Sequence, residues 1–192
     1  MVSEPLILAF DTSAAHCAAA LLQGERVLVS RAEPMGRGQA ERLMPLLQEV
    51  LDQAGFAWSD LDRIGVGIGP GNFTGIRISV AAARGLALSL GIPTIGISTL
   101  DAIRAQARVG APCVPAPRDM AYTQTGKAAP ELVAIATVTD PVFPPEPALL
   151  AELMARLAAQ AAQDGPPPAP LYVRPADAAP ARDLPPVILD DA

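Results

Sequence analysis

The chain has 192 residues, of which 51% are hydrophobic and 18% charged, and its formal net charge is −6. This composition is typical of a globular protein with a mildly acidic surface, and it excludes a general electrostatic attraction to nucleic acid. No uncharged run approaches the roughly 18 residues of a membrane span, and the N-terminus lacks the pattern of a secretory signal, so we expect a cytoplasmic protein with no membrane contact. In that compartment Cys17 and Cys113 are expected to be buried thiols.

The first half of the chain alternates short apolar runs with amphipathic stretches. Three apolar runs predict an antiparallel meander of strands, and they span residues 6–10, 17–22 and 26–30. Apolar residues at spacings of three and four then predict a helix over 39–54, which ends at Gly55. The next predicted elements are a strand over 63–69, a helix over 75–90 capped by Asn72 or Thr74, a strand over 94–98 and a helix over 99–108.

This order of elements predicts the fold class. Three antiparallel strands followed by alternating helices and strands are the order of a ribonuclease-H-like lobe, the unit that is duplicated in the actin-like ATPases (the ASKHA fold). We therefore predict an α/β protein whose N-terminal lobe, residues 1–108, is complete.

The second half, residues 109–192, differs in composition, because 16 of the 21 prolines follow Ala111. We predict a strand over 132–138, an alanine-rich helix over 148–162 and a proline-rich linker over 165–170 that leads to a tail. This region is interpreted as a shortened C-terminal lobe with a tail.

A glycine-rich stretch lies between the strand at 63–69 and the helix that follows it. The strand's period of two places Ile64, Val66 and Ile68 on one face and only glycines on the other, which indicates a close approach by a helix or an open cleft floor. The loop over 69–75 offers backbone N–H groups at a helix N-terminus, which favours an anion, although a tight strand-to-helix turn explains it equally well. It matches neither the Walker nor the dinucleotide-binding motif. The residues of a possible phosphate-binding remnant are Asp11, Thr12, Ser13, Gly69, Gly71, Asn72 and Thr74.

Several catalytic classes are excluded by residues that the chain lacks. His16 is the single histidine, so a metal site with two histidines one helical turn apart cannot form, and no G-x-S-x-G motif accompanies it as a serine hydrolase would require. A ribonuclease-H nuclease needs a further carboxylate where the chain has Gly69-Pro70-Gly71, so Glu41 and Glu49 are interpreted as charges on a helix surface. We therefore expect no catalytic residue and no metal site in this chain.

Four segments in the same order together resemble the TsaB (YeaZ) family. They are ILAFDTS at residues 7–13, AERLMPLL at 40–47, GPGNFTGIRI at 69–78 and YVRP at 172–175. The resemblance covers roughly the first 105 residues, is poor through the middle and resumes at the tail. It implies a non-catalytic partner of TsaD, the metal- and nucleotide-binding enzyme that completes threonylcarbamoylation of the adenosine next to the anticodon in tRNA.

The resemblance also implies partners and a contact surface. The first two helices would bind TsaD or, when TsaD is absent, a second copy of the chain in a homodimer, and TsaE would join a larger complex. The isolated chain would need no cofactor, with ATP or ADP placed only at the interface with TsaD, and direct contact with tRNA is left open. The interface candidates are Glu41, Met44, Pro45, Gln48, Ile78, Ala81, Ala82 and Gly85. Where the family commonly has a His-Ser pair ahead of the first helix, this chain has Gly38-Gln39, which puts the polar detail of the interface in question.

Two other functions stay open at this point. The first is a small actin-like ATPase or phosphotransferase that would use Asp11, Thr12 and the loop at 69–75. The second, by family analogy alone, is a glycoprotease-like peptidase.

Overall fold

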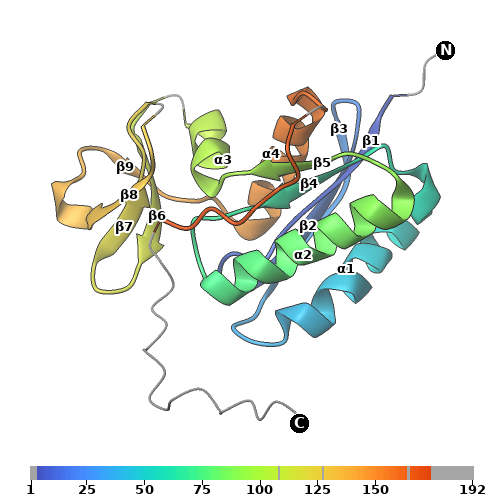
Figure 1. Ribbon diagram of the computed structural model, residues 1–192, viewed down its shortest axis with the longest axis horizontal. Helices are drawn as coiled ribbons and strands as arrows, with labels where there is room; N and C mark the ends of the chain where they lie inside the picture. The colour runs from blue at the N-terminus through green and yellow to red at the C-terminus, as the bar shows by residue number, and fades with distance from the viewer. Residues whose placement is uncertain (1–3, 108, 127, 164, 174–192) are drawn as a thin grey trace, which may run out of the picture.

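Two sheets and four α-helices make up the part of the chain that this computed structural model describes, residues 4–107, 109–126, 128–163 and 165–173 (Figure 1). The strands are β1 (Leu6–Asp11), β2 (His16–Gln23), β3 (Arg26–Pro34), β4 (Arg63–Gly67), β5 (Thr94–Ile97), β6 (Ala111–Ala116), β7 (Met120–Thr123), β8 (Glu131–Ala134) and β9 (Pro141–Val142). The helices are α1 (Gln39–Ala54), α2 (Phe73–Leu90), α3 (Thr99–Gln106) and α4 (Pro147–Gln160), with 3-10 turns at Trp58–Asp60 and Ile135–Thr137.

The first sheet has the order β3-β2-β1-β4-β5. Strands β1, β2 and β3 pair antiparallel, and β4 and β5 then continue the sheet in parallel with β1. The predicted meander and the α/β class are therefore confirmed, and the mixed sheet is consistent with a ribonuclease-H-like fold. Helix α1 has the predicted bounds, and α2 begins at Phe73 because the Asn72 side chain accepts the N–H of Gly75 as a cap.

Alternation along the strands separates two cores of different character. On one face the side chains are large, such as Leu8, Phe10 and Val66, and they pack against α1 and α2. On the other face the small Ala9 lies among Ile7, Leu22 and Ile97, and these residues pack against α4. Figure 1 shows α1 and α2 side by side along one face of the sheet.

Helix α4 approaches the sheet closely at Gly65 and Ala9, where that face lacks bulky side chains. A Cβ atom added at Gly65 would lie 2.9 Å from the Cβ of Ala158 and 3.2 Å from the Cβ of Ala9. The glycines of β4 therefore accommodate a helix, which is the first of the two explanations given by the sequence. Because α4 comes from the second half of the chain, it ties that half to the first sheet, and the division at residue 108 stays a prediction.

The second sheet, in the order β8-β7-β6-β9, corrects the prediction for the middle of the chain. Only β8 was predicted, and it ends at Ala134, where a 3-10 turn replaces the rest of the expected strand over 132–138. Strand β6 was missed because it contains Pro112 and Pro115, which lack the N–H that a strand donates. It pairs antiparallel with β7 and in parallel with β9.

The predicted linker over 165–170 packs against the first sheet. Pro168 is buried, and a Cβ atom added at Gly96 of β5 would lie 3.1 Å from its Cβ. The N–H of Leu171 donates to the carbonyl of Ile68 at 2.8 Å. This segment therefore covers the β5 side of the sheet, while Arg174 and Pro175 of the predicted tail motif lie outside the described residues.

Arg63 should stabilise the end of α4. Its guanidinium is buried and donates to the carbonyls of Ala158, Ala159 and Ala161, which have no partners within the helix. The substitution Arg63→Met keeps most of the stem but removes these bonds, so we expect the free energy of unfolding in urea to fall by about 2 to 3 kcal/mol. The matched change Arg26→Met, at an exposed position of β3, should cost far less, and equal losses would contradict this role.

Cys17 should make stability depend on alkaline pH. Its thiol is fully buried, and burial, helped by Glu33, raises its pKa from an ordinary 9.0 to about 11. The unfolded chain therefore ionises first, and the stability that Cys17 contributes below pH 9 is lost as the pH rises toward 11. In urea titrations, the advantage of the wild type over Cys17→Ala should shrink by up to about 2.7 kcal/mol between pH 8 and pH 11. A constant difference would mean that the folded thiol ionises freely.

Candidate functional site

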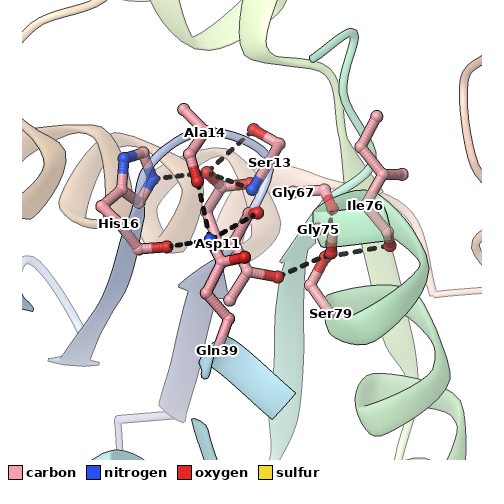
Figure 2. A network of polar contacts seen from close by, with 10 residues as sticks. Asp11, Ser13, Ala14, His16, Gln39, Gly67, Gly75, Ile76 and Ser79 are labelled. Atoms are coloured by element: carbon pink, nitrogen blue, oxygen red, sulfur yellow. Dashed lines mark hydrogen bonds and ion pairs between the residues drawn. The ribbon is translucent and has the colours of Figure 1, made fainter. Parts of the chain in front are cut away.

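Asp11 lies at the end of β1 and is completely buried. Its Oδ2 accepts hydrogen bonds from the backbone N–H of Ser13 at 3.1 Å and from Ser13 Oγ at 2.9 Å, and it lies 2.7 Å from His16 Nε2 (Figure 2). Its Oδ1 is buried without a hydrogen-bond partner among the described residues. The carboxylate is thus held by the turn that follows β1, the role that capping and turn residues would predict.

Gln39 holds the same turn from the side of α1. Its Nε2 is within hydrogen-bonding distance of the carbonyls of Thr12, Ala14 and His16 (Figure 2). The side chain is buried, so this departure from the family's His-Ser pair lies inside the molecule and away from the exposed surface of the helix. The question about the polar detail of the interface therefore does not apply to Gln39, whose side chain is buried in this chain.

The two loops of the predicted phosphate-binding remnant lie against one another. The N–H of Asn72 donates to the carbonyl of Ser13 at 2.6 Å, and Thr12 Oγ1 donates to the carbonyl of Gly75 at 2.7 Å. A side chain at Gly71 would overlap the Ser13 carbonyl. The structure therefore brings the two loops together, and the N–H groups of Asn72 and Gly75, which could meet a phosphate, are used within the protein. Thr74 is exposed and is not the cap of the helix.

The loops border a cavity of about 680 Å³ that also involves the second sheet. Its walls come from the turn after β1, the start of α2, strands β6 and β7, and the segment that leads into α4. Among the described residues that line it, none is Lys, Arg, Asp or Glu. The cavity therefore supplies no cationic side chain for a triphosphate. Sequence reasoning could not find it, because the strands of its far wall were not predicted.

No cluster of three or more histidine, cysteine or acidic side chains within the described ranges could hold a metal ion. Cys17 and Cys113 are both buried free thiols in the structure, as predicted. Neither thiol adds a ligand to the turn at Asp11.

The predicted interface residues lie on the outer surfaces of α1 and α2. On α1, Glu41, Met44, Pro45 and Gln48 are all exposed, and Met44 exposes 40% of its surface. On α2, Ala81 and Gly85 are exposed, whereas Ile78 and Ala82 are half-buried and pack against the core. We name this surface the α1–α2 face.

Leu88 lies on the exposed side of α2, in a hollow that Gly85 and Pro167 also line, and the sequence analysis did not name it. It is 87% exposed, and its position three residues after Gly85 on a helix was the signal that could have found it. Of the helices that the structure describes, α2 alone has the length and mean hydropathy, 1.2, of a membrane span, and only 28% of it is buried.

Charged residues border the α1 side of this face. Arg42 forms ion pairs with Glu33 at 2.6 Å and with Glu49 at 2.7 Å, and Arg31 adds a third contact to Glu49. Hydrogen bonds from Arg42 hold the pKa of both Glu33 and Glu49 below the ordinary value of a glutamate. Glu49 is therefore a surface charge, as predicted, and it links α1 to β3.

The sheet order and the helices on both of its faces define an α/β protein that is consistent with the ribonuclease-H-like class. The family model for "TsaD: tRNA N6-adenosine threonylcarbamoyltransferase" matches residues 33–141, which is more than half of the chain. The chain belongs to the TsaB (YeaZ) family within this group.

Individual relatives agree with that assignment. The tRNA threonylcarbamoyladenosine biosynthesis protein TsaB of Buchnera aphidicola subsp. Schizaphis graminum is 40% identical over 102 residues, which cover 53% of this chain and 48% of the relative. TsaB of Escherichia coli K12 is 38% identical over 94 residues, which cover 49% of this chain and 40% of the relative. The chain therefore spans less than half the length of each of these curated relatives.

A solved structure matches over a larger share of the chain. The crystal structure of a Pseudomonas aeruginosa protein described as similar to peptidase YEAZ has a TM-score of 0.71 at 26% identity, covering 88% of this chain and all of that one. YeaZ from Pseudomonas aeruginosa has a TM-score of 0.65, also at 26% identity, and covers 80% of this chain and 92% of that one.

Residue 67 should have to be glycine for the fold to be stable, because the Asp11 side chain lies against it. A Cβ atom at residue 67 would overlap Asp11 Oδ1, and the carboxylate is held in place through its other oxygen. We expect Gly67→Ala to lower the free energy of unfolding by about 1 to 3 kcal/mol in a urea titration.

The control is Gly85→Ala on α2, where an added Cβ meets no atom within 4 Å. That change should be neutral or stabilise the helix by up to about 1 kcal/mol, because alanine favours helix more than glycine does. If both variants behaved alike, the contact between Gly67 and Asp11 would not be the cause.

Proposed function

We propose that this chain is a non-catalytic scaffold that binds TsaD through its α1–α2 face and so supports the biosynthesis of threonylcarbamoyladenosine in tRNA. The observation that carries the proposal is the exposed apolar surface of two adjacent helices, with Leu88 87% and Met44 40% exposed. Methionine and other apolar side chains at the centre of a patch, with charged residues at its border, are typical of protein interfaces. The names of the TsaB relatives supply the tRNA modification.

Small residues on α2 support a helix-to-helix contact in particular. Ala81 and Gly85 are exposed one helical turn apart, and no neighbouring atom lies within 4 Å of a Cβ built at Gly85. A partner helix could therefore approach the backbone of α2 closely. The same surface would serve a homodimer when TsaD is absent, since a two-fold contact uses one patch on both copies.

The absence of catalysis is proposed from the geometry of the loops. Asp11 is enclosed, the loop N–H of Asn72 is bonded to Ser13, and the described walls of the cavity contain no Lys, Arg, Asp or Glu. These features support a phosphate-loop shape that is retained for packing and for presenting α2. They weigh against an ATPase and, with a single histidine, against a peptidase.

The remaining parts of the proposal follow the family. The fold would be an actin-like (ASKHA) fold with a complete first lobe and a shortened second lobe, located in the cytoplasm. The chain itself would hold no cofactor, ATP or ADP would lie only at the contact with TsaD, and TsaE would join the larger complex. Direct contact with tRNA is not part of the proposal.

The test is size-exclusion chromatography with light scattering on this chain alone and mixed with TsaD from the same organism. We expect a one-to-one complex, and we expect Met44→Glu and Ala81→Glu each to weaken it at least about tenfold, because a charge placed at the centre of an apolar interface loses its water. Ala136→Glu, which adds the same charge at an exposed position next to β8, is the matched control and should leave the complex intact.

Two results would contradict the proposal. Elution profiles that simply add at micromolar concentrations would remove the scaffold role, and equal losses in all three variants would move the contact away from the α1–α2 face. Calorimetry with ATP on the isolated chain tests the alternative enzyme, and tight binding there would favour an ATPase.

A further inference from the structure

His16 stands apart from the proposed scaffold role, because it lines the cavity between the two sheets. It is the first residue of β2, and it is 7% exposed. Its Nε2 lies 2.7 Å from Asp11 Oδ2, and within the described residues the ring makes no second hydrogen bond. In Figure 2 the other ring nitrogen faces away from Asp11.

Asp11 determines which ring nitrogen carries the proton. A carboxylate oxygen accepts hydrogen bonds, so this bond is donated by Nε2, and in an imidazole whose proton is on Nε2 the Nδ1 nitrogen is an acceptor. Ser13 donates to the same Oδ2 through its N–H and its Oγ, which fixes the carboxylate and therefore the ring. The His16 side chain is nine-tenths buried and His16 lines the cavity, so Nδ1 is the candidate hydrogen-bond acceptor for a ligand there.

The other residues that line the cavity indicate which kind of ligand it could bind. Tyr122 and Phe143 line it together with aliphatic residues such as Val114 and Leu150. Phe73 also lines it, but its ring packs against Tyr172 and Arg77. The polar residues of the lining, besides His16, are Ser13, Asn72 and Thr99. No Lys, Arg, Asp or Glu lines it within the described residues. A volume of about 680 Å³ falls in the range of small-molecule sites, which are mostly apolar with a few placed polar groups.

We propose that this cavity binds an uncharged aromatic small molecule that donates one N–H or O–H hydrogen bond to His16 Nδ1. The apolar walls would supply most of the affinity through burial of the rings, and the histidine would fix the orientation. A nucleotide is disfavoured because its phosphates would have no cation to meet. None of the residues of the α1–α2 face lines this cavity, so the ligand proposal and the scaffold proposal can be tested independently.

The test compares indole with benzofuran, which has nearly the same shape but replaces the N–H donor by an oxygen. Binding to the full chain is measured by calorimetry and by saturation-transfer NMR. We expect both probes to bind and indole to bind about 3- to 10-fold more tightly, the ratio that one net hydrogen bond gives. In His16→Phe this ratio should fall to about one.

A second variant separates the cavity from the histidine. Ala116 is half-buried and lines the cavity, so Ala116→Phe should fill it and abolish binding of both probes while the thermal unfolding midpoint stays close to that of the wild type. The proposal is overturned if neither probe binds the wild type at millimolar concentration, if the two bind the wild type equally, or if Ala116→Phe leaves binding unchanged. If His16→Phe fails to fold, the comparison of the two probes on the wild type still tests the proposal.

Discussion

The close packing of α4 against the first sheet is the constraint on which the arrangement of this chain depends. Small side chains on β1 and β2 and glycine at residue 65 let the helix lie against the strands, and Arg63 holds the end of the helix by its carbonyls. The segment that leads into α4 passes the turn after β1, and it therefore brings the second sheet next to Asp11 and His16. A bulkier face would push α4 outward and open the cavity.

The two faces of the first sheet explain why one surface is left apolar. Large residues on one face are covered completely by the inner sides of α1 and α2. Two helices on one sheet bury only one stripe each, so the outer sides of α1 and α2 must meet water or a partner. Glu41, Gln48 and Arg84 lie there and suit water, but Met44 and Leu88 are exposed on the same two helices. This apolar exposure is the physical basis for the scaffold proposal. The paired charges around Arg42 border this surface without interrupting it.

The turn at Asp11 and the glycine loop show how a phosphate-loop shape can become a packing element. Each loop fills the space of the other, because a carbonyl of the first turn occupies the place of a side chain at Gly71 and at Gly75. The carboxylate of Asp11 likewise occupies the space beside Gly67. The glycines that suggested a ligand site are therefore explained by contacts within the protein, whereas the cavity next to them has aromatic walls that the glycine pattern did not indicate.

The sequence by itself determined the first sheet, the bounds of α1, the cap of α2 and the alternation of glycine with large residues on β4. These features are local, since periodicity, caps and turns depend on neighbours along the chain. The family resemblance named α1 and α2 as the contact surface, and that stays a prediction. Only the tertiary structure decided that α4 fills the glycine face, that proline-containing β6 joins a sheet, that Gln39 holds the turn at Asp11, and that His16 faces a cavity. Each of these depends on contacts between residues far apart in the sequence, and a single sequence carries no direct record of which distant segments pack together.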